Sequence, residues 1–318
     1  MSQIDAIDKL HLYYACMKLH QVRALVAIAE TGSFMAAAEH LRISQSSLSH
    51  AIADLEEELN LRLLERGREG TVPTEAGRRV LIHARQISAC LDSIRAEAAN
   101  MAGLLSGKVR IGSVPSAAVA FLPRLIAQVV HEHPQVEVLL LEEPSQGMQQ
   151  LIEWLKNNVI DVALLELPVN GLHVVSLMSD ELCAIVSKSS PLARRAKISI
   201  RELAEKPFIM SRYNSERLIW NAYAAHKCSP QVRFEVQDIG TLVSMVREGL
   251  GVSIVPRVAF PLIPDGVILR PVNPCLRREL AFVMKSPDRL GPALGMFIRK
   301  AHELVELSRA ARVHRRSR

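Results

Sequence analysis

The chain lacks the sequence features of a membrane-anchored, exported or disulfide-bonded protein. It contains no run of about 18 apolar residues, which excludes an ordinary transmembrane helix. The first 16 residues include Asp5 and Asp8 and have no apolar core like that of a signal peptide. The five cysteines are far apart, with no CxxC pair and no metal-like cluster. We therefore expect a cytoplasmic protein with reduced thiols; a redox pair of Cys183 and Cys228 is the minor alternative.

The chain also lacks the short motifs that mark common enzymes. A P-loop, GxGxxG, HExxH and GxSxG are all missing, and the 11 histidines are scattered. We predict that the protein is not an enzyme and needs no cofactor. Its net charge of +6 lies mainly near the end, because residues 277–318 hold eleven Lys and Arg against four Asp and Glu. Overall basicity is therefore no argument for a nucleic-acid partner.

Residues 17–77 carry the clearest pattern in the chain. Leu19, Val22, Leu25 and Val26 recur at helical spacing, and Gly32 is suited to end that helix. A second short helix follows, in which small alanines allow another helix to cross closely. Ser44 is a good N-cap for a third helix, whose apolar face includes Leu48, Ile52 and Leu55. This arrangement predicts a helical unit with a tight turn.

The start of the third helix carries small polar side chains on its outer face. Gln45, Ser46, Ser47, Ser49 and His50 point away from the predicted core. A recognition helix presents such groups to base edges in the DNA major groove, where Gln can bond adenine through both amide atoms. A small helical bundle with a polar face is the alternative.

A small hairpin is predicted after this helix. Two glycines, flanking β-formers and Pro73 indicate a tight turn between two short strands. Arg66 and Arg68 would lie on this wing, within reach of phosphates, and Arg42 adds a further local positive charge.

The stretch from Leu19 to Gly77 resembles the winged helix-turn-helix of LysR-type transcriptional regulators. The matching motifs have fixed spacings; they are Ala29-Glu30-Thr31-Gly32-Ser33-Phe34, Ala36-Ala37-Ala38, Ser44-Gln45-Ser46-Ser47-Leu48-Ser49, Leu55-Glu56, Leu64-Glu65-Arg66 and Thr74-Glu75-Ala76-Gly77. The departures are His50 where Arg is frequent, Asn60 for Gly, Leu64 for Phe and Ser46 for Pro. The replacement at His50 puts the usual arginine contact in doubt.

The resemblance implies a ligand-responsive regulator that binds double-stranded promoter DNA at an inverted repeat. Its partners would be a small-molecule effector, further copies of the chain in a homodimer or homotetramer, and RNA polymerase, with no membrane. The predicted DNA-binding residues are Ser33, Met35, Ser44, Gln45, Ser46, Ser47, Ser49, His50, Arg66 and Arg68.

A long helix is predicted from Thr74 to about Leu105. Its apolar residues alternate in steps of four and three; they are Val80, Ala84, Ile87, Leu91, Ile94, Ala98 and Met101. So narrow an apolar seam is typical of a pair of helices, so we predict a linker and dimerisation helix over residues 78–106. The alternative is that this face packs on the chain's own second domain.

Residues 107–318 alternate between strand and helix patterns. Val109–Ser113, 136–141 and 160–165 are predicted strands separated by helices, and a similar unit recurs over 207–255. This order predicts parallel sheets covered on both faces. The fold class is therefore α/β, with a helix-rich winged head, a long linker helix and a bilobed effector domain. In LysR regulators, which the chain resembles, the two lobes follow a periplasmic-binding-protein-like fold.

The predicted domains follow from these patterns. Residues 1–16 are an N-terminal extension, 17–77 the winged head, 78–106 the linker helix and 107–318 the effector domain. Lobe 1 would comprise 107–166 and 267–318, and lobe 2 would comprise 167–266. The chain would cross between the lobes near 166–171 and 266–271, and a final helix over about 290–311 would close lobe 1.

Ligands of open α/β sheets bind beyond the carboxyl ends of strands. Hydroxyls and helix starts there favour a small, anionic metabolite, with Arg212 as a candidate counter-charge. The predicted effector residues are Ser113, Pro115, Ser116, Ser145, Tyr213, Asn214, Ser215, Gly240 and Thr241. Each serine could equally be a plain N-cap. A solute-binding receptor without a role in transcription is the alternative function, but it would not need residues 17–77.

Overall fold

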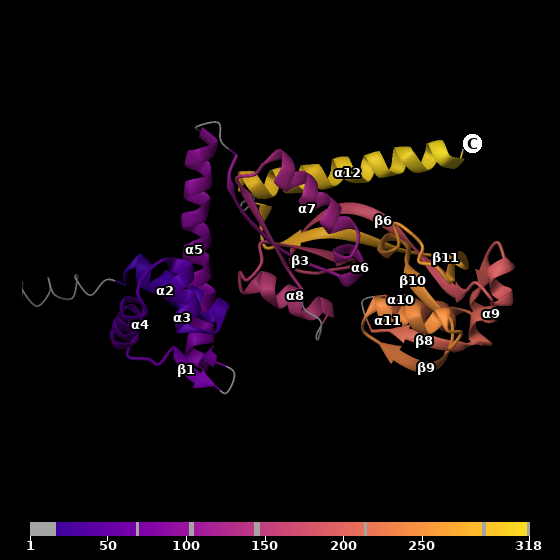
Figure 1. The fold of residues 1–318 in the computed structure, drawn as a ribbon, viewed down its shortest axis with the longest axis horizontal. Coiled ribbons are helices and arrows are strands. Elements are labelled where there is room, and N and C mark those ends of the chain that lie inside the picture. The colour runs from indigo at the N-terminus through magenta and orange to yellow at the C-terminus, as the bar shows by residue number, and fades with distance from the viewer. Residues whose placement is uncertain are drawn as a thin grey trace, which may run out of the picture. The chain divides into compact units, whose positions relative to one another are not determined.

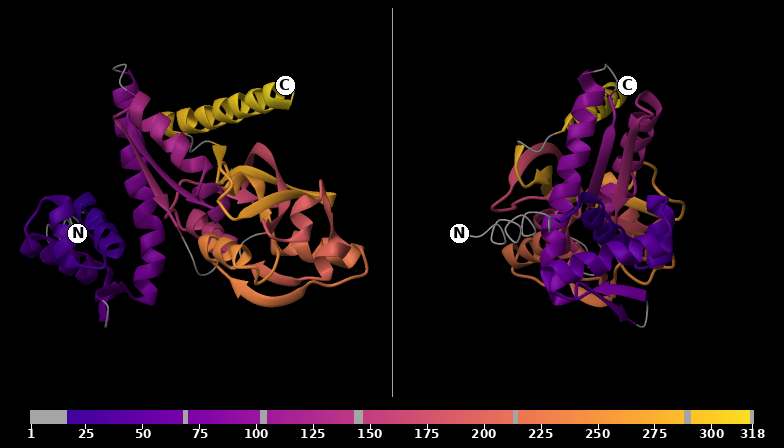
Figure 2. Two further views of the ribbon diagram at one scale, coloured as in Figure 1. Left: turned by 45° about the vertical axis from the view of Figure 1, so that its right-hand side comes forward. Right: turned by 90° about the vertical axis from the view of Figure 1, so that its left-hand side faces the viewer.

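The computed structural model describes residues 17–67, 70–101, 105–142, 147–212, 215–287 and 291–316. The chain divides into two compact units, Met1–Arg95 and Ala96–Arg318. Figures 1 and 2 show the elements of both units.

The first unit is a three-helix head with a two-stranded wing. Its elements are α2 (Leu19–Thr31), α3 (Phe34–Leu41), α4 (Gln45–Leu59), β1 (Leu64–Gly67) and β2 (Gly70–Pro73). β1 and β2 pair antiparallel, as the sequence predicted for the wing. Leu25, Leu48 and Leu55 are fully buried in one core, which explains why three short helices hold together. Gly32 ends α2 with φ of 67°, the left-handed conformation expected of a glycine C-cap.

The long helix α5 (Glu75–Met101) follows the wing. Residues 102–104, at the end of the predicted helix, lie outside the described residues. The N-terminal part of its apolar seam packs into the head, where Ala84 is buried and Val80 and Ile87 are partly buried against the same core. Further along, Ile94 is 61% exposed and Met101 is 89% exposed. The first part of the seam therefore packs within the chain, and the second part is exposed and has room for a partner helix.

The second unit is built on one mixed sheet of seven strands. They are β3 (Gly107–Ser113), β4 (Val136–Leu141), β5 (Val162–Glu166), β6 (His173–Ser187), β7 (Ile198–Ser199), β10 (Ser253–Pro256) and β11 (Val267–Met284), in the order β10-β6-β11-β5-β3-β4 with β7 beside β11. β3 pairs parallel with β4 and β5, as predicted. β11, which the sequence did not predict, runs antiparallel to β5 and β6, so the sheet is mixed.

Helices cover both faces of the sheet in lobe 1. The elements there are α6 (Pro115–Ala118), α7 (Phe121–Glu132), α8 (Gly147–Lys156) and α12 (Pro292–Arg316). In Figure 1, α7 and α12 lie on the side of the sheet opposite to α8. Phe282 of β11 and Phe297 of α12 meet edge to face in this core, with ring centroids 6.2 Å apart. α12 thus packs on lobe 1, as the sequence predicted for the last helix.

Lobe 2 contains a separate two-stranded parallel sheet. Its elements are η1 (Pro191–Arg194), α9 (Ile200–Ala204), β8 (Pro207–Ser211), α10 (Glu216–Ala225), β9 (Gln231–Val236), α11 (Ile239–Arg247) and η2 (Arg257–Ala259). Its core includes Phe208 and Tyr223, whose rings lie edge to face at 5.8 Å.

β6 and β11 are long strands that run through both lobes. On β6, Leu177 belongs to the lobe 1 core and Leu182 to the lobe 2 core. On β11, Leu280 lies in the lobe 1 core, while Leu276 packs against lobe 2. The cores therefore divide in the middle of these strands, and not near 166–171 and 266–271, where the sequence predicted the crossings. The paired strands continue through both cores, so no loop is needed at the crossing.

Candidate functional site

The start of α4 presents a cluster of exposed polar side chains. Ser44 is its N-cap, as predicted, and its hydroxyl accepts a hydrogen bond from the Ser47 backbone N–H at 3.1 Å. The hydroxyls of Ser46 and Ser47 lie 2.9 and 2.8 Å from that of Ser44. Gln45 and Ser49 are also exposed. The first turn of α4 is thus tied together by serine hydroxyls, and its outer face is open to a partner.

An open groove of about 510 Å³ lies beside this helix start. It is lined by Thr31, Gly32, Ser33, Phe34, Met35, Gln45, Ser49, Gly67, Gly70 and Thr71. It therefore brings together four of the predicted DNA-binding residues, which are Ser33, Met35, Gln45 and Ser49. The prediction did not include the groove lining supplied by Phe34 and by the wing glycines.

Close backbone contacts hold the wing against the helix turn. The Thr71 backbone N–H donates to the Gly32 carbonyl oxygen at 2.8 Å. Gly70 has φ of +128°, and a Cβ there would lie 2.6 Å from the same oxygen. At the base of the wing, a Cβ on Gly77 would lie 1.9 Å from the Leu63 carbonyl oxygen. These glycines are required by close approach of the backbone, so the shape of the groove is fixed by the fold.

A carboxylate near the end of α4 fixes the strand that enters the wing. Glu56 accepts hydrogen bonds from the Leu63 and Leu64 backbone N–H groups at 2.7 and 3.1 Å. It also pairs with Arg62 at 3.1 Å. Arg66 lies on β1, although its side chain is outside the described residues, as is the whole of Arg68.

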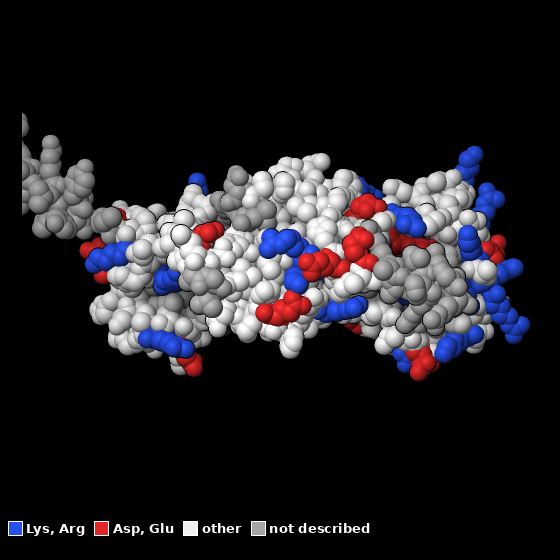
Figure 3. All heavy atoms as spheres, turned by 90° about the horizontal axis from the view of Figure 1, so that it is seen from above, with Lys and Arg blue, Asp and Glu red and all other residues white. Residues whose placement is uncertain are grey.

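The head carries no excess of positive charge. Residues 1–79 hold nine Lys and Arg against eleven Asp and Glu. Figure 3 shows both signs on the visible face of this unit. Any nucleic-acid contact by the head must therefore depend on local placement of donors and not on a broad basic field.

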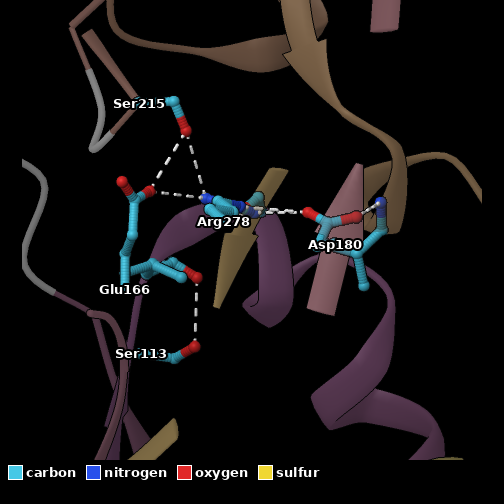
Figure 4. Close-up of polar contacts among 8 residues, drawn as sticks. Ser113, Glu166, Asp180, Ser215 and Arg278 are labelled. Carbon is cyan, nitrogen blue, oxygen red and sulfur yellow. Dashed lines mark hydrogen bonds and ion pairs between the residues drawn. The ribbon is translucent and has the colours of Figure 1, made fainter. Parts of the chain in front are cut away.

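A second polar cluster lies in the second unit, where β6 and β11 pass between the lobes. At its centre is Arg278 of β11, whose side chain is fully buried (Figure 4). Its Nε and Nη2 both donate to the Asp180 carboxylate of β6, at 3.0 and 2.9 Å. Its Nη2 also donates to the Ser116 hydroxyl at 2.6 Å, and its Nη1 to Glu166 and Ser215, each at 3.4 Å.

This cluster connects both lobes. Ser116 lies on α6 of lobe 1, and Glu166 ends β5 in the same lobe. Ser215 is the N-cap residue of α10 in lobe 2, and its hydroxyl donates to Glu166 at 3.2 Å. Asp180 also accepts from the Val258 backbone N–H at 2.9 Å. A change in the relative position of the lobes must therefore rearrange the hydrogen bonds around Arg278.

Burial and nearby positive charge act in opposite directions on the pKa of Glu166. Burial raises the pKa of this carboxyl above its ordinary value, and the positive charge of Arg278, with its hydrogen bond, opposes that rise. Arg217, on the first turn of α10, acts in the same direction as Arg278 through its charge. The raised pKa shows that the cost of desolvation outweighs these attractions.

The predicted effector residues are only partly brought together. Ser116 and Ser215 meet at Arg278, whereas Ser113 is buried and donates to the Val114 carbonyl oxygen at 3.0 Å. Pro115 is the first residue of α6 and is half-buried. Thr241 is exposed at the start of α11, and its neighbour Gly240 is also on that first turn. Ser145, Tyr213 and Asn214 lie outside the described residues.

Thr241 and Arg212 each contact a neighbouring carboxylate. The hydroxyl of Thr241 donates to the Asp238 side chain at 2.9 Å, as part of the α11 cap. Arg212, the predicted counter-charge, forms an exposed ion pair with Glu235 at 2.9 Å. The charged residues that do meet at the lobe boundary, Arg278, Asp180 and Glu166, were missed. Nothing in the local sequence singled them out, because other polar residues and prolines interrupt β6 and β11.

None of the described helices is long and apolar enough to cross a membrane. No group of three or more His, Cys, Asp or Glu side chains is placed to hold a metal ion in that part of the chain.

Comparison with protein families identifies both units. Residues 19–78 match the model described as a bacterial regulatory helix-turn-helix protein of the LysR family. Residues 102–305 match the LysR substrate-binding domain. The chain belongs to the LysR family of transcriptional regulators. It is a DNA-binding regulator with an effector-binding domain, as the sequence motifs predicted.

Relatives with curated names support this assignment along most of the chain. A probable regulator from Synechococcus elongatus, LrrA, is 36% identical over 89% of this chain and 95% of its own length. An uncharacterised regulator from Bacillus subtilis, YvbU, is 30% identical over 91% of this chain and 99% of its own length. Both are described as helix-turn-helix transcriptional regulators. The alternative of a solute-binding receptor is therefore wrong.

Solved structures of the family share the fold. A full-length OxyR from Pseudomonas aeruginosa, solved as a point variant, matches with a TM-score of 0.72 and 22% identity, covering 90% of this chain and 95% of that one. Full-length CbnR in complex with its target DNA matches with a TM-score of 0.64 and 18% identity, covering 90% and 99%. At these identities the likeness establishes the architecture alone.

Proposed function

We propose that this LysR-type regulator binds an inverted repeat in promoter DNA through the start of α4, with the wing beside it. The observation that carries this proposal is the groove between α3, α4 and the wing, where exposed Gln45 and Ser49 are joined by Ser33 and Met35. Such a helix start presents its side chains to base edges. Ser44, Ser46, Ser47 and His50, exposed on the same turns, are further contacts.

The wing supplies contacts of a different kind. Arg66 and Arg68 are proposed to bind phosphates, which position the protein without reading sequence. A gel-shift titration with the DNA upstream of the gene tests the whole proposal. Specific retardation that survives excess unrelated DNA supports it, and retardation that unrelated DNA removes completely contradicts it.

The regulator is proposed to act as a homodimer or a dimer of dimers. The support is the open part of the α5 seam, where Ile94 and Met101 are exposed, whereas the seam residues near the start of the helix pack into the head. A two-fold assembly matches an inverted repeat, because each head would meet one half-site.

The effector is proposed to be a small anionic metabolite bound at the lobe boundary around Arg278. The hydroxyls of Ser116 and Ser215 come from different lobes and already share its guanidinium. A ligand that replaces one of these contacts would favour one arrangement of the lobes and shift the population of DNA-binding states. Because Asp180 and Glu166 already compensate Arg278, an anion would bind best with Glu166 protonated.

The remaining predicted residues complete this proposal. Ser113, Pro115 and Ser145 would line the lobe 1 side, and Tyr213, Asn214, Gly240 and Thr241 the lobe 2 side. A melting screen of the full chain against succinate, malate and benzoate tests the ligand class. A shift that is lost in both Ser116→Ala and Thr241→Ala supports the proposal. A shift retained in both variants, or absent with all three acids, contradicts it.

Regulation of transcription implies a cytoplasmic location, contact with RNA polymerase and no catalytic activity of its own. Curated relatives are regulators, which supports this reading.

A further inference from the structure

The groove beside α4 holds one exposed apolar side chain among polar ones. Met35 of α3 is 71% exposed, although its neighbour Phe34 packs against the core of the head. A single exposed methionine is ordinary on a protein surface. Here, however, it lines the same groove as Gln45 and Ser49.

The chemistry of this groove matches one kind of base pair. The amide of Gln can bond the N6 and N7 atoms of adenine together, and an apolar side chain can contact the C5 methyl group of thymine. In the major groove, an A·T pair is the one that offers both features on a single edge. A G·C pair offers no methyl group.

We propose that Met35 is a specificity-determining residue that packs on the methyl group of a thymine in each half-site. Together with Gln45, it would select an A·T pair at that position. This inference rests on the proposed function of the head and adds to it the identity of the base feature that is read. The side chain is suited to this role, because a flexible thioether adapts to an irregular apolar surface.

Met35 is placed for this contact by the start of α3 and is not needed for the core of the head. Ser33 precedes α3 in extended conformation, so Met35 lies on the first turn of that helix. The buried residues of α3 are Ala37 and Ala38, which face the core. Substitution of Met35 should therefore leave the head folded, and melting temperature provides the check.

The test replaces thymines in the operator one at a time by deoxyuridine, which removes only the methyl group. Full-length protein is titrated at fixed salt with each DNA. At one thymine per half-site, affinity should fall about fourfold, the effect of losing one buried methyl-sized contact at about 0.8 kcal/mol. Thymines elsewhere in the operator serve as internal controls.

Variants then assign the effect to Met35. Met35→Ser should bind thymine and deoxyuridine operators equally at that position, while Met35→Leu should retain the difference. Gln45→Ala should also retain it, because its loss removes a separate contact. The inference is overturned if the wild type distinguishes no thymine from deoxyuridine, or if Met35→Ser distinguishes them as the wild type does. A wild type that binds no operator would instead overturn the proposed function.

Discussion

At the scale of single residues, Gln45 is the side chain on which specific binding should depend most. It is exposed on the first turn of α4 and lines the groove. Gln45→Ala should weaken operator binding by about 1–3 kcal/mol without loss of fold, because a bidentate base contact is removed. Fluorescence anisotropy at fixed salt measures the change. Gln149→Ala, the same substitution at an exposed position of α8, is the control and should bind as the wild type does.

The charge state of Glu166 should affect the stability of the folded protein. Its pKa in the folded protein is raised by burial, so the folded state holds this proton at pH values where the unfolded state has lost it. As pH rises from about 4.5 through the raised pKa, this group therefore makes the folded state progressively less stable. Glu166→Gln, which mimics the protonated form, should remove this decline.

Urea unfolding at a series of pH values measures the effect. Above the raised pKa, Glu166→Gln should be at least as stable as the wild type. A variant that is clearly less stable at pH 7 would show that the Arg278–Glu166 attraction exceeds the cost of burial. Glu132→Gln, at a carboxylate whose pKa is lowered by its hydrogen bond with Lys300, provides a control of opposite sign.

At the scale of elements, α5 carries the prediction about assembly. Leu91→Asp with Ile94→Asp would place two carboxylates in the open part of the seam, where burial of unpaired charge is costly. The variant should be monomeric by light scattering and should bind the operator without cooperativity.

The matched control adds the same charge on another face of the helix. Ser93→Asp with Asn100→Asp changes two exposed residues outside the seam and should leave the dimer intact. If the seam variant keeps the mass of the wild type, the dimer interface lies elsewhere. If both variants become monomeric, the loss of the dimer is due to the added charge and not to disruption of the seam.

Local sequence patterns predicted the elements that are set by residues close to one another in the sequence. α2, α3 and α4 follow from helical spacing, and the cap at Ser44 follows from its hydroxyl. β6 and β11 were not predicted, because polar residues such as Ser179 and prolines such as Pro271 interrupt their apolar runs. The cluster at Arg278 was missed for a related reason. Arg278 and Asp180 are 98 residues apart, and only pairing of the two long strands joins them.

At the scale of the whole molecule, the chain combines a DNA-binding head with a two-lobed effector-binding domain. The open part of the α5 seam would form the interface of the proposed dimer. The hydrogen bonds of Arg278 connect the two lobes. Two heads related by two-fold symmetry should contact two half-sites on one face of the duplex, spaced by about 10–10.5 base pairs or a multiple of that.

DNase footprinting of the DNA upstream of the gene would show directly whether two heads occupy two half-sites. We expect two protected half-sites of an inverted repeat, both lost with Gln45→Ala at a protein concentration that protects them in the wild type. Protection of a single site without symmetry would contradict the two-fold arrangement. Absence of any protected sequence, with folded dimeric protein at low salt, would contradict the assignment of the head as the reader of this DNA.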